Sequence, residues 1–396
     1  MTSHARFPER ERRVAGAPSV DPLSPAAQII AAASRERPAD AVLRETLRRR
    51  SDLSAEDRRA ISRAVFSYYR WLGWLDTKRP LLSQLKHALE LANAFADRPN
   101  SFSDEKLVGR SIAPWVHEHC GVNPAWARAI QAEPRLWLRA KRGRGSVLAR
   151  KLGECWIPGA RALADAIAYQ GSEDLFRSRE FHAGEFEIQD VASQAVGLIC
   201  DPKPGEVWWD ACAGEGGKTL HLSDLMANKG LIWASDRAGW RLRQLKRRAG
   251  RAGCFNYRAA VWDGGSNLPT RTRFDGVLLD APCTGVGTWQ RNPQARWTTT
   301  PADVAELAAV QLNLLAHTAP AVKPGGRLIY AVCTLTRAET EEVARIFVER
   351  FPEFEPASIR SPWEEIHQTP YLRLWPQDTG GNGMFLAAWQ RKLTGG

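Results

Sequence analysis

Hydrophobic positions follow a helical period in the first quarter of the chain. The apolar stripe of the segment that begins at Ser54 consists of Ile61, Val65, Tyr68, Tyr69 and Leu72. These residues are three or four positions apart, so they share one face of an amphipathic helix. Ser54 and Asp57 are spaced as a capping box at its start. We interpret the aromatic residues of the stripe as core packing, and we expect helices from Ser24 to about Ala96.

From about residue 190 the pattern changes to short apolar runs that alternate with helical segments. The runs are 206–211, 231–236, 274–281 and 327–334, and the helical segments are 217–230, 241–250, 301–317 and 337–350. Such alternation predicts an α/β fold with a parallel, doubly wound, Rossmann-like sheet that carries helices on both faces. Thr336 and Glu339 are spaced as a capping box for the last of these helices. Ligands of such sheets bind beyond the carboxyl ends of the strands.

These patterns divide the chain into four parts. We expect a disordered basic tail over 1–22, an all-helical domain over 23–132, a small αβ module over 133–185 and the α/β domain over 186–394. The small module begins with the most basic segment of the chain, 134–154, in which Trp137 lies among several Arg and Lys residues. An aromatic residue among cations suits a nucleic acid, and a solvated basic face explains it equally well.

Charge and cysteine content narrow the class of protein. The 55 Lys and Arg residues exceed the 44 Asp and Glu residues, which gives a net charge of +11. This excess favours a polyanionic partner, although solubility alone would also explain it. Seven cysteines without a C-x-x-C pair argue against a disulfide framework and a metal site, and indicate a reducing cytoplasm. No run is apolar and long enough for a membrane span or a signal peptide.

A glycine-rich loop follows the run 206–211. Gly214, Gly216 and Gly217 allow a ligand to approach the backbone, but the spacing is that of neither a Walker A loop nor a dinucleotide fingerprint. Asp236 ends the next run, where an acid would bind ribose hydroxyls, and Asp263, in VWDG, follows a further strand, near where an adenine amino group could be read. Each Asp taken singly is more often a helix cap or a turn residue. Together they predict a nucleoside ligand and favour S-adenosylmethionine over NAD.

Two cysteines end neighbouring strands of the predicted sheet. Cys283 follows the run 274–281 and Cys333 ends the run 327–334, and Asp280 lies shortly before Cys283. A single buried cysteine is usually an inert small hydrophobe, but two at adjacent strand ends call for chemistry. A thiolate that adds to carbon 6 of cytosine makes carbon 5 nucleophilic toward an electrophilic methyl group. Asp280 could hold the base, and the second thiol could remove the carbon-5 proton from a base that stands outside a helix.

The motifs around these residues resemble the Sun/Fmu family of RNA cytosine-C5 methyltransferases, most closely its bacterial ribosomal RNA members. The resembling segments are GEFEIQDVASQAV, DACAGEGGKT, DAPCTGVGTWQRNPQARW, YAVCTL and LWPQDTGGNGMFLAAWQRK, which together span residues 184–392. Residues 24–130 resemble, more weakly, the NusB-like helical domain of that family. The small module then stands where the family has an RNA-binding αβ module.

The resemblance implies roles for individual residues. Cys333 would be the nucleophile, Cys283 would release the product, and Asp280 would face both the base and the cofactor. The residues implied to line S-adenosylmethionine are Cys212, Ala213, Gly214, Glu215, Gly216, Gly217, Lys218, Asp236, Asp263 and Asp280. The partner would be RNA, with ribosomal RNA favoured, and the protein would act as a monomer in the cytoplasm without a metal or a membrane.

The chain departs from the family's pattern at several positions. Glu215 replaces a proline of the cofactor loop, Ala331 and Val332 replace Ser-Thr before the nucleophile, and Asn382 and Met384 replace Asp and Phe of the terminal motif. Three other functions therefore stay open. They are a non-catalytic RNA-binding or ribosome-assembly factor on this scaffold, an N-methyltransferase, and, least favoured, a nicotinamide dehydrogenase.

Overall fold

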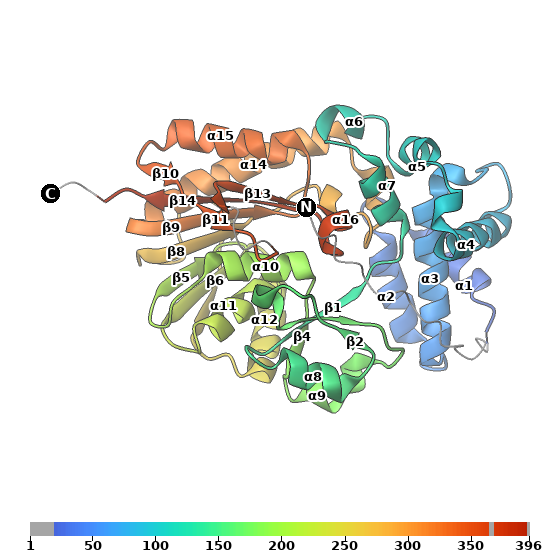
Figure 1. Cartoon of the computed structure of the whole chain (residues 1–396), viewed down its shortest axis with the longest axis horizontal. Coiled ribbons are helices and arrows are strands. Elements are labelled where there is room, and N and C mark those ends of the chain that lie inside the picture. The colour runs from blue at the N-terminus through green and yellow to red at the C-terminus, as the bar shows by residue number, and fades with distance from the viewer. Residues whose placement is uncertain (1–19, 364–367, 394–396) are drawn as a thin grey trace. The chain divides into compact units, whose positions relative to one another are not determined.

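The computed structural model describes residues 20–363 and 368–393, so most of the tail expected to be disordered, 1–22, lies outside the described residues. The chain forms two compact units (Figure 1). The helical unit contains residues up to 134 together with 286–300. The α/β unit contains residues 135–285 and those from 301 onward. Among the described residues, no helix is long and apolar enough to cross a membrane.

The helical unit is built around the predicted amphipathic helix. Its α-helices are α1 (Leu23–Ala32), α2 (Ala39–Arg49), α3 (Ala55–Trp71), α4 (Leu81–Asp97), α5 (Asp104–Ser111), α6 (Val116–His119) and α7 (Pro124–Gln131). The predicted capping box of α3 is confirmed, because Ser54 and Asp57 bond each other's backbone N–H groups. Ile61, Val65 and Tyr69 are buried in the core of this unit, as the helical period predicts.

Residues 286–300, which the sequence pattern placed in the α/β domain, pack within the helical unit. This segment contains the short helix α13 (Ala295–Thr298), and its Arg296 is fully buried. The Arg296 guanidinium donates hydrogen bonds to Gln131 Oε1 at 2.6 Å and to the carbonyl oxygen of Ile130. Gln294 Oε1 accepts a hydrogen bond of 2.6 Å from the backbone of Ala39. The segment is therefore a structural part of a unit that is distant in sequence.

A four-stranded antiparallel sheet opens the α/β unit. Its strands are β1 (Leu136–Ala140), β2 (Cys155–Trp156), β3 (Ala166–Tyr169) and β4 (Phe186–Ile188) in the order β2-β3-β1-β4, with helices α8 (Gly145–Leu152) and α9 (Arg179–His182). Trp137 is buried, and its Nε1 donates to the carbonyl oxygen of Gly380. Arg139 is also buried and pairs with Asp224. The suggestion that Trp137 serves a nucleic acid is therefore wrong, because its ring is part of the core.

The predicted doubly wound sheet is confirmed. Its parallel strands are β5 (Val207–Asp210), β6 (Leu231–Asp236), β7 (Tyr257–Val261), β8 (Phe274–Asp280) and β9 (Val322–Val332). Antiparallel strands β10 (Phe354–Pro356), β13 (Tyr371–Leu374) and β14 (Met384–Arg391) extend the sheet beyond β9, in the order β10-β14-β9-β8-β5-β6-β7 with β13 on β14. A separate pair, β11 (Ile359–Arg360) and β12 (Gln368–Thr369), lies outside this sheet.

Helices cover both faces of this sheet, as Figure 1 shows. Helices α10 (Val191–Cys200), α11 (Gly217–Leu225) and α12 (Gly239–Ala252) lie on one face, and α14 (Pro301–Thr318) and α15 (Glu341–Arg350) on the other. The short α16 (Pro376–Thr379) precedes β14. Tryptophan, phenylalanine and leucine side chains fill the core beneath α14 and α15. A second apolar core lies on the opposite face of the sheet, beneath α10 and α11. Both cores fix the positions of the strands, so the carboxyl ends of β5, β6, β8 and β9 lie along one edge of the sheet.

Candidate active site

The sheet brings the two predicted cysteines into contact. Strands β8 and β9 are parallel neighbours, and Asp280 at the end of β8 lies opposite Ala331. Cys283 and Cys333 follow these strands, and their Sγ atoms are 3.3 Å apart in a shared hydrogen bond. This contact joins residues that are 50 positions apart in the chain. A thiol pair at strand ends, as the sequence predicted, is thus present in the structure.

The environment differs between the two thiols. The hydrogen bond from Cys283 lowers the pKa of the Cys333 thiol, and the positive charge of Lys218 acts in the same direction against the effect of burial. The same hydrogen bond, together with burial, raises the pKa of the Cys283 thiol well above its usual value. Cys333 is therefore the thiol that ionises first, with Cys283 as the protonated donor. A thiolate, unlike a thiol, is a competent nucleophile.

Lys218 and Asp280 form an ion pair next to the thiols. Lys218 Nζ lies 2.6 Å from Asp280 Oδ2, with little of either side chain exposed. Burial opposes the charge on Lys218, but the attraction and hydrogen bond of Asp280 outweigh it, so the pKa of Lys218 is raised. The site therefore holds a fixed cation between Asp280 and the Cys333 sulfur, where it stabilises negative charge.

A buried carboxylate that the sequence pattern did not reveal connects both thiol loops. Glu339 Oε1 accepts hydrogen bonds from the Thr284 backbone N–H at 2.9 Å and from Gln311 Nε2 at 3.2 Å. Glu339 Oε2 accepts from the hydroxyl groups of Thr284 (2.5 Å), Thr334 (3.0 Å) and Thr336 (2.8 Å). Thr284 follows Cys283, and Thr334 follows Cys333. One side chain therefore links the two loops that carry the sulfur atoms.

The predicted capping box of Thr336 and Glu339 is wrong, because the Glu339 carboxylate binds the two thiol loops and does not cap a helix. Glu339 ends a short 3-10 turn, Arg337–Glu339, and α15 begins only at Glu341 after a break at Thr340. Its carboxylate receives the hydroxyl of Thr336 and points to the thiol loops instead of capping a helix. The local spacing was correct, but the long-range partners Thr284 and Gln311 could not be identified from it.

The glycine-rich loop lies at the end of β5. Gly214 has a left-handed backbone with φ of 56°, and a side chain there would meet only open space. Gly216, at φ of 87°, packs against Leu245 of α12 and leaves no room for a Cβ atom. Asp236 Oδ2 accepts a hydrogen bond from the backbone N–H of Gly214 at 3.0 Å. The acid at the end of β6 thus holds the loop in place.

A second missed acid lies beneath this loop. Asp210 is fully buried; Thr219 donates to its Oδ2 at 2.6 Å, whereas its Oδ1 has no hydrogen-bond partner among the residues that the structure describes. Burial raises the pKa of Asp210 to about 7. The signal was available in the sequence, because Asp210 ends a strand in the same way as Asp236. An unpaired buried acceptor at a strand end is where a ligand donor is expected.

The remaining predicted cofactor residues occupy the same region. Ala213 is buried and Cys212 half-buried in the loop, and Glu215 is exposed, with its backbone oxygen bonded to Arg248. Burial raises the pKa of the Cys212 thiol, which keeps it protonated. Asp263 is exposed after β7, and its Oδ1 accepts from the Gly265 backbone N–H. This hydrogen bond within a turn is the contact expected of an Asp with a structural role.

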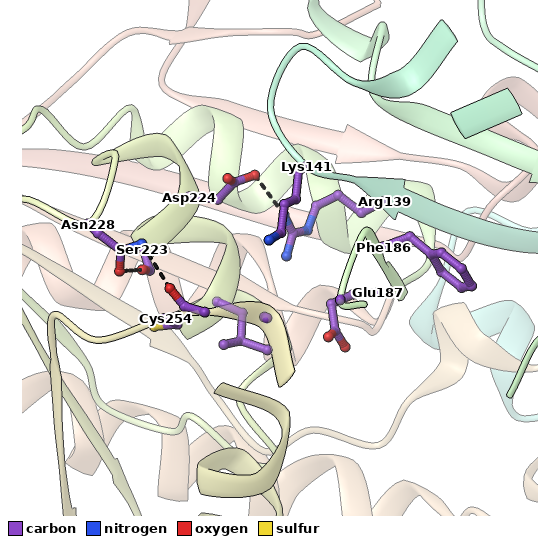
Figure 2. A pocket seen from close by; sticks show the side chains of 12 residues that line it. Arg139, Lys141, Phe186, Glu187, Ser223, Asp224, Asn228 and Cys254 are labelled. Atoms are coloured by element: carbon purple, nitrogen blue, oxygen red, sulfur yellow. Dashed lines mark hydrogen bonds and ion pairs between the residues drawn. The ribbon is translucent and has the colours of Figure 1, made fainter. Parts of the chain in front are cut away.

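A small pocket elsewhere in the α/β unit contains none of these residues. It lies between the antiparallel sheet and helices α11 and α12, and Figure 2 shows Arg139 directed at Asp224 and Ser223 bonded to Asn228. Its volume is about 30 Å³, which suits a water molecule and is far too small for a nucleoside. The thiol pair and the loop after β5 are therefore the better candidate for chemistry.

Comparison with known proteins agrees with this placement. The family described as 16S rRNA methyltransferase RsmB/F matches residues 197–390, a segment that includes both thiols, Asp280 and the glycine-rich loop. This segment belongs to the RsmB/F family. The probable ribosomal RNA small subunit methyltransferase B of Bacillus subtilis is 37% identical over 219 residues, which are 54% of this chain and 49% of the relative. The chain thus spans about half the length of that RsmB relative.

Other relatives extend the match. The ribosomal RNA small subunit methyltransferase B of Cronobacter sakazakii is 30% identical over 69% of this chain and 66% of its own length. The crystal structure of PH0851 matches 94% of this chain and 99% of that protein with a TM-score of 0.77 at 23% identity. A methyltransferase homologue from Pyrococcus horikoshii matches 68% of this chain and 90% of its own, with a TM-score of 0.59 at 26% identity. The architecture of an RsmB/F-family segment with preceding helical and αβ parts is thereby confirmed.

The departures from the Sun/Fmu pattern do not remove side chains from the thiol pair. Ala331 and Val332 are fully buried in β9. Met384 is buried at the start of β14, and the backbone N–H of Asn382 donates to Asp190 Oδ1. Glu215 leaves its carboxylate in solvent. The sulfur contact and the Lys218–Asp280 pair are intact despite these substitutions.

Proposed function

We propose that this protein is an S-adenosylmethionine-dependent methyltransferase that methylates carbon 5 of a cytosine in ribosomal RNA. The observation that carries the proposal is the 3.3 Å contact between Cys283 and Cys333 beside the Lys218–Asp280 ion pair. The printed names of the RsmB relatives support ribosomal RNA as the substrate class.

Cys333 is the nucleophile in this proposal, because its pKa is the lowered one of the two thiols. Its thiolate adds to carbon 6 of the target cytosine, and the electrons of the 5,6 double bond make carbon 5 nucleophilic. Carbon 5 then takes a methyl group. Once Cys333 is bonded to carbon 6 it no longer accepts the Cys283 hydrogen bond, and the Cys283 thiol gives its proton to solvent. The resulting Cys283 thiolate removes the carbon-5 proton, the double bond re-forms, and the bond between carbon 6 and Cys333 breaks to release the Cys333 thiolate. The cytosine must stand outside a helix to reach both sulfurs.

Asp280 orients the base in the proposed reaction. Lys218 binds its Oδ2 atom, so Oδ1 is left to accept a hydrogen bond from the exocyclic amine of cytosine. Lys218 also lies close enough to Cys333 to stabilise its thiolate. Both effects act before the carbon–sulfur bond forms, because they favour the ionised thiol and the correct ring position.

The residues around the glycine-rich loop fit S-adenosylmethionine. Asp210 Oδ1 is a buried acceptor without a partner among the described residues, which suits an ammonium group, and Gly214 leaves open space at the loop. Asp236, at the end of β6, would bind the ribose hydroxyls, and Asp263 and the loop residues Cys212 to Lys218 complete the proposed set. When bound, this cofactor supplies an electrophilic methyl group. The loop and the thiols lie at the ends of adjacent strands β5, β8 and β9.

Two finer expectations belong to this proposal. We infer a monomer, which light scattering of the purified chain would test. We also infer a reducing, cytoplasmic location, with which the seven free thiols of the chain are compatible. The alternative of a non-catalytic RNA-binding factor has no need for two thiols in contact, and the experiment below separates it from an enzyme.

The test incubates the protein with labelled S-adenosylmethionine and ribosomal RNA. Cys333→Ala is expected to abolish 5-methylcytosine, a loss of roughly 10⁴-fold or more. Cys283→Ala is expected to methylate once and then remain covalently attached to RNA, because proton removal stalls. Nucleoside mass spectrometry and denaturing gels measure the two outcomes. Normal methylation by Cys333→Ala would refute the nucleophile, and the absence of an adduct with Cys283→Ala would remove the release role.

A further inference from the structure

The segment that joins β6 to the end of β7 in the α/β unit is one-sided in charge. Residues 237–262 contain eight Arg and Lys residues and no Asp or Glu. Six of the eight lie on α12, whose buried side consists of Leu242, Leu245 and Ala249. The helix therefore packs through one apolar stripe and displays its cations around the rest of its surface.

One flank of α12 is neutralised. Arg248 pairs with Glu187 at 2.9 Å, and Arg251 pairs with the other oxygen of the same carboxylate at 2.5 Å. These ion pairs attach α12 to strand β4 of the antiparallel sheet. Both arginines therefore have a structural role. Neither can bind a ligand unless its ion pair with the buried Glu187 is broken.

The other flank of α12 has no such partner. Arg243, Lys246 and Arg247 are exposed, and among the described residues none of the three contacts a carboxylate. Trp240, which lies three residues before Arg243 on the same side of the helix, is 51% exposed. Phe255, just beyond the end of α12, is 79% exposed. An exposed aromatic ring at each end of an unneutralised row of cations is unusual for a simple solvated surface.

We propose that one face of α12 binds the phosphate backbone of the substrate RNA at nucleotides other than the target cytosine. This α12 basic face consists of Trp240, Arg243, Lys246 and Arg247. The proposal rests on the proposed function for the identity of the RNA. A row of three cations without acids complements closely spaced phosphates, and exposed rings provide surfaces on which unpaired bases stack. The partner is single-stranded RNA rather than a duplex, because only unpaired bases can stack on Trp240 and Phe255.

The test measures binding of a fluorescent single-stranded RNA to the full chain without S-adenosylmethionine, over a range of salt concentrations. The triple variant Arg243→Gln, Lys246→Gln and Arg247→Gln should bind more weakly, and the slope of log K against log salt should become shallower by about 2. Phe255→Ala should lose roughly tenfold in affinity while the salt slope stays unchanged, because it removes stacking and no charge.

The matched control removes the same charge from separate places. Arg271, Arg350 and Arg360 are exposed residues of the α/β unit that lie apart in the sequence. Their triple change to Gln should leave the salt slope within error of the unsubstituted chain. An equal change of slope in both triple variants would overturn the proposal, because net charge alone would then explain binding.

Two further outcomes separate this face from the proposed reaction. If the chain methylates RNA and the α12 triple variant keeps the full salt slope, the basic face is refuted and the function stands. If the chain binds RNA with the predicted slopes but transfers no methyl group, the function fails and the face stands. Preferential binding of the α12 face to anionic lipid vesicles or to duplex DNA over single-stranded RNA would also contradict the proposal.

Discussion

At the scale of single residues, the two thiols are distinguished by the direction of one hydrogen bond. Cys283 donates to Cys333, which lowers the pKa of the Cys333 thiol and raises that of the Cys283 thiol. In the sequence, each of the two residues is a cysteine that follows a strand, and only the resemblance to the Sun/Fmu family assigned them different roles. The physical difference between the two thiols arises when the two loops are brought into contact.

This difference predicts the pH dependence of alkylation. A lowered pKa means that the Cys333 thiolate persists to lower pH than an ordinary thiol, so iodoacetamide should label Cys333 before the other cysteines as pH rises. Cys283→Ala removes the hydrogen-bond donor, and the labelling curve of Cys333 should shift to higher pH. Peptide mass spectrometry over a pH series measures both curves. Coincident curves for the wild type and Cys283→Ala would contradict the assigned direction of the hydrogen bond.

At the scale of elements, Glu339 ties the loop after β8 to the loop after β9. Two N–H donors bind its Oε1 atom, and three hydroxyl groups bind its Oε2 atom. A glutamine can keep most of this set, because its oxygen accepts from the two N–H groups and its amide donates to two of the three hydroxyl groups, which also accept. An alanine leaves buried donors unpaired on both loops.

We therefore expect Glu339→Gln to keep the thiols together and Glu339→Ala to separate them. Diamide, which oxidises two adjacent thiols to a disulfide, should link Cys283 to Cys333 quickly in the wild type and in Glu339→Gln, and slowly in Glu339→Ala. Methyl transfer by Glu339→Ala should fall by roughly 10²-fold, the effect of a displaced reacting group. Glu342→Ala, an exposed glutamate paired with Arg345, is the control. Equal cross-linking in all four proteins would rule out the role of Glu339.

At the scale of the whole molecule, the chain crosses between its two units three times, after residues 134, 285 and 300. Residues 286–300 leave the α/β unit after the Cys283 loop, and they supply Trp289 and Arg296 to the interior of the helical unit. Arg296 is buried, no carboxylate of the described residues contacts it, and burial lowers its pKa well below its usual value. Its charge is held by hydrogen bonds to Gln131 and backbone oxygens, which few other environments would supply.

Removal of residues 1–134 should therefore damage the remainder of the chain. Trp289 and Arg296 would lose their partners, so the shortened chain should aggregate or expose 286–300 to protease. Trypsin should cleave it at Arg291 and Arg296 at least tenfold faster than it cleaves the full chain, because a buried segment must unfold before it is cut. Limited proteolysis with mass spectrometry measures this. Equal protection of these sites in both proteins would show that the segment folds independently.

Local patterns in the sequence predicted the strands of the α/β domain and the residues at their ends. The alternation of apolar runs and helices gave the strands β5, β6, β8 and β9, and residues at their ends gave Cys283, Cys333 and Asp280. Periodicity and strand-end position are local properties, which neighbouring residues encode directly. The family's motifs lie at strand ends, and this position was predicted from the same local pattern.

Which side chains contact one another became known from the folded chain alone. It buried Trp137 in the core, directed Glu339 to the thiol loops, left Asp210 Oδ1 unpaired and gave residues 286–300 to the helical unit. Each of these depends on contacts between positions far apart in the chain, such as Ala39 and Gln294, which are separated by 255 residues. Burial and hydrogen bonding are set by those distant neighbours, so no local pattern could supply them.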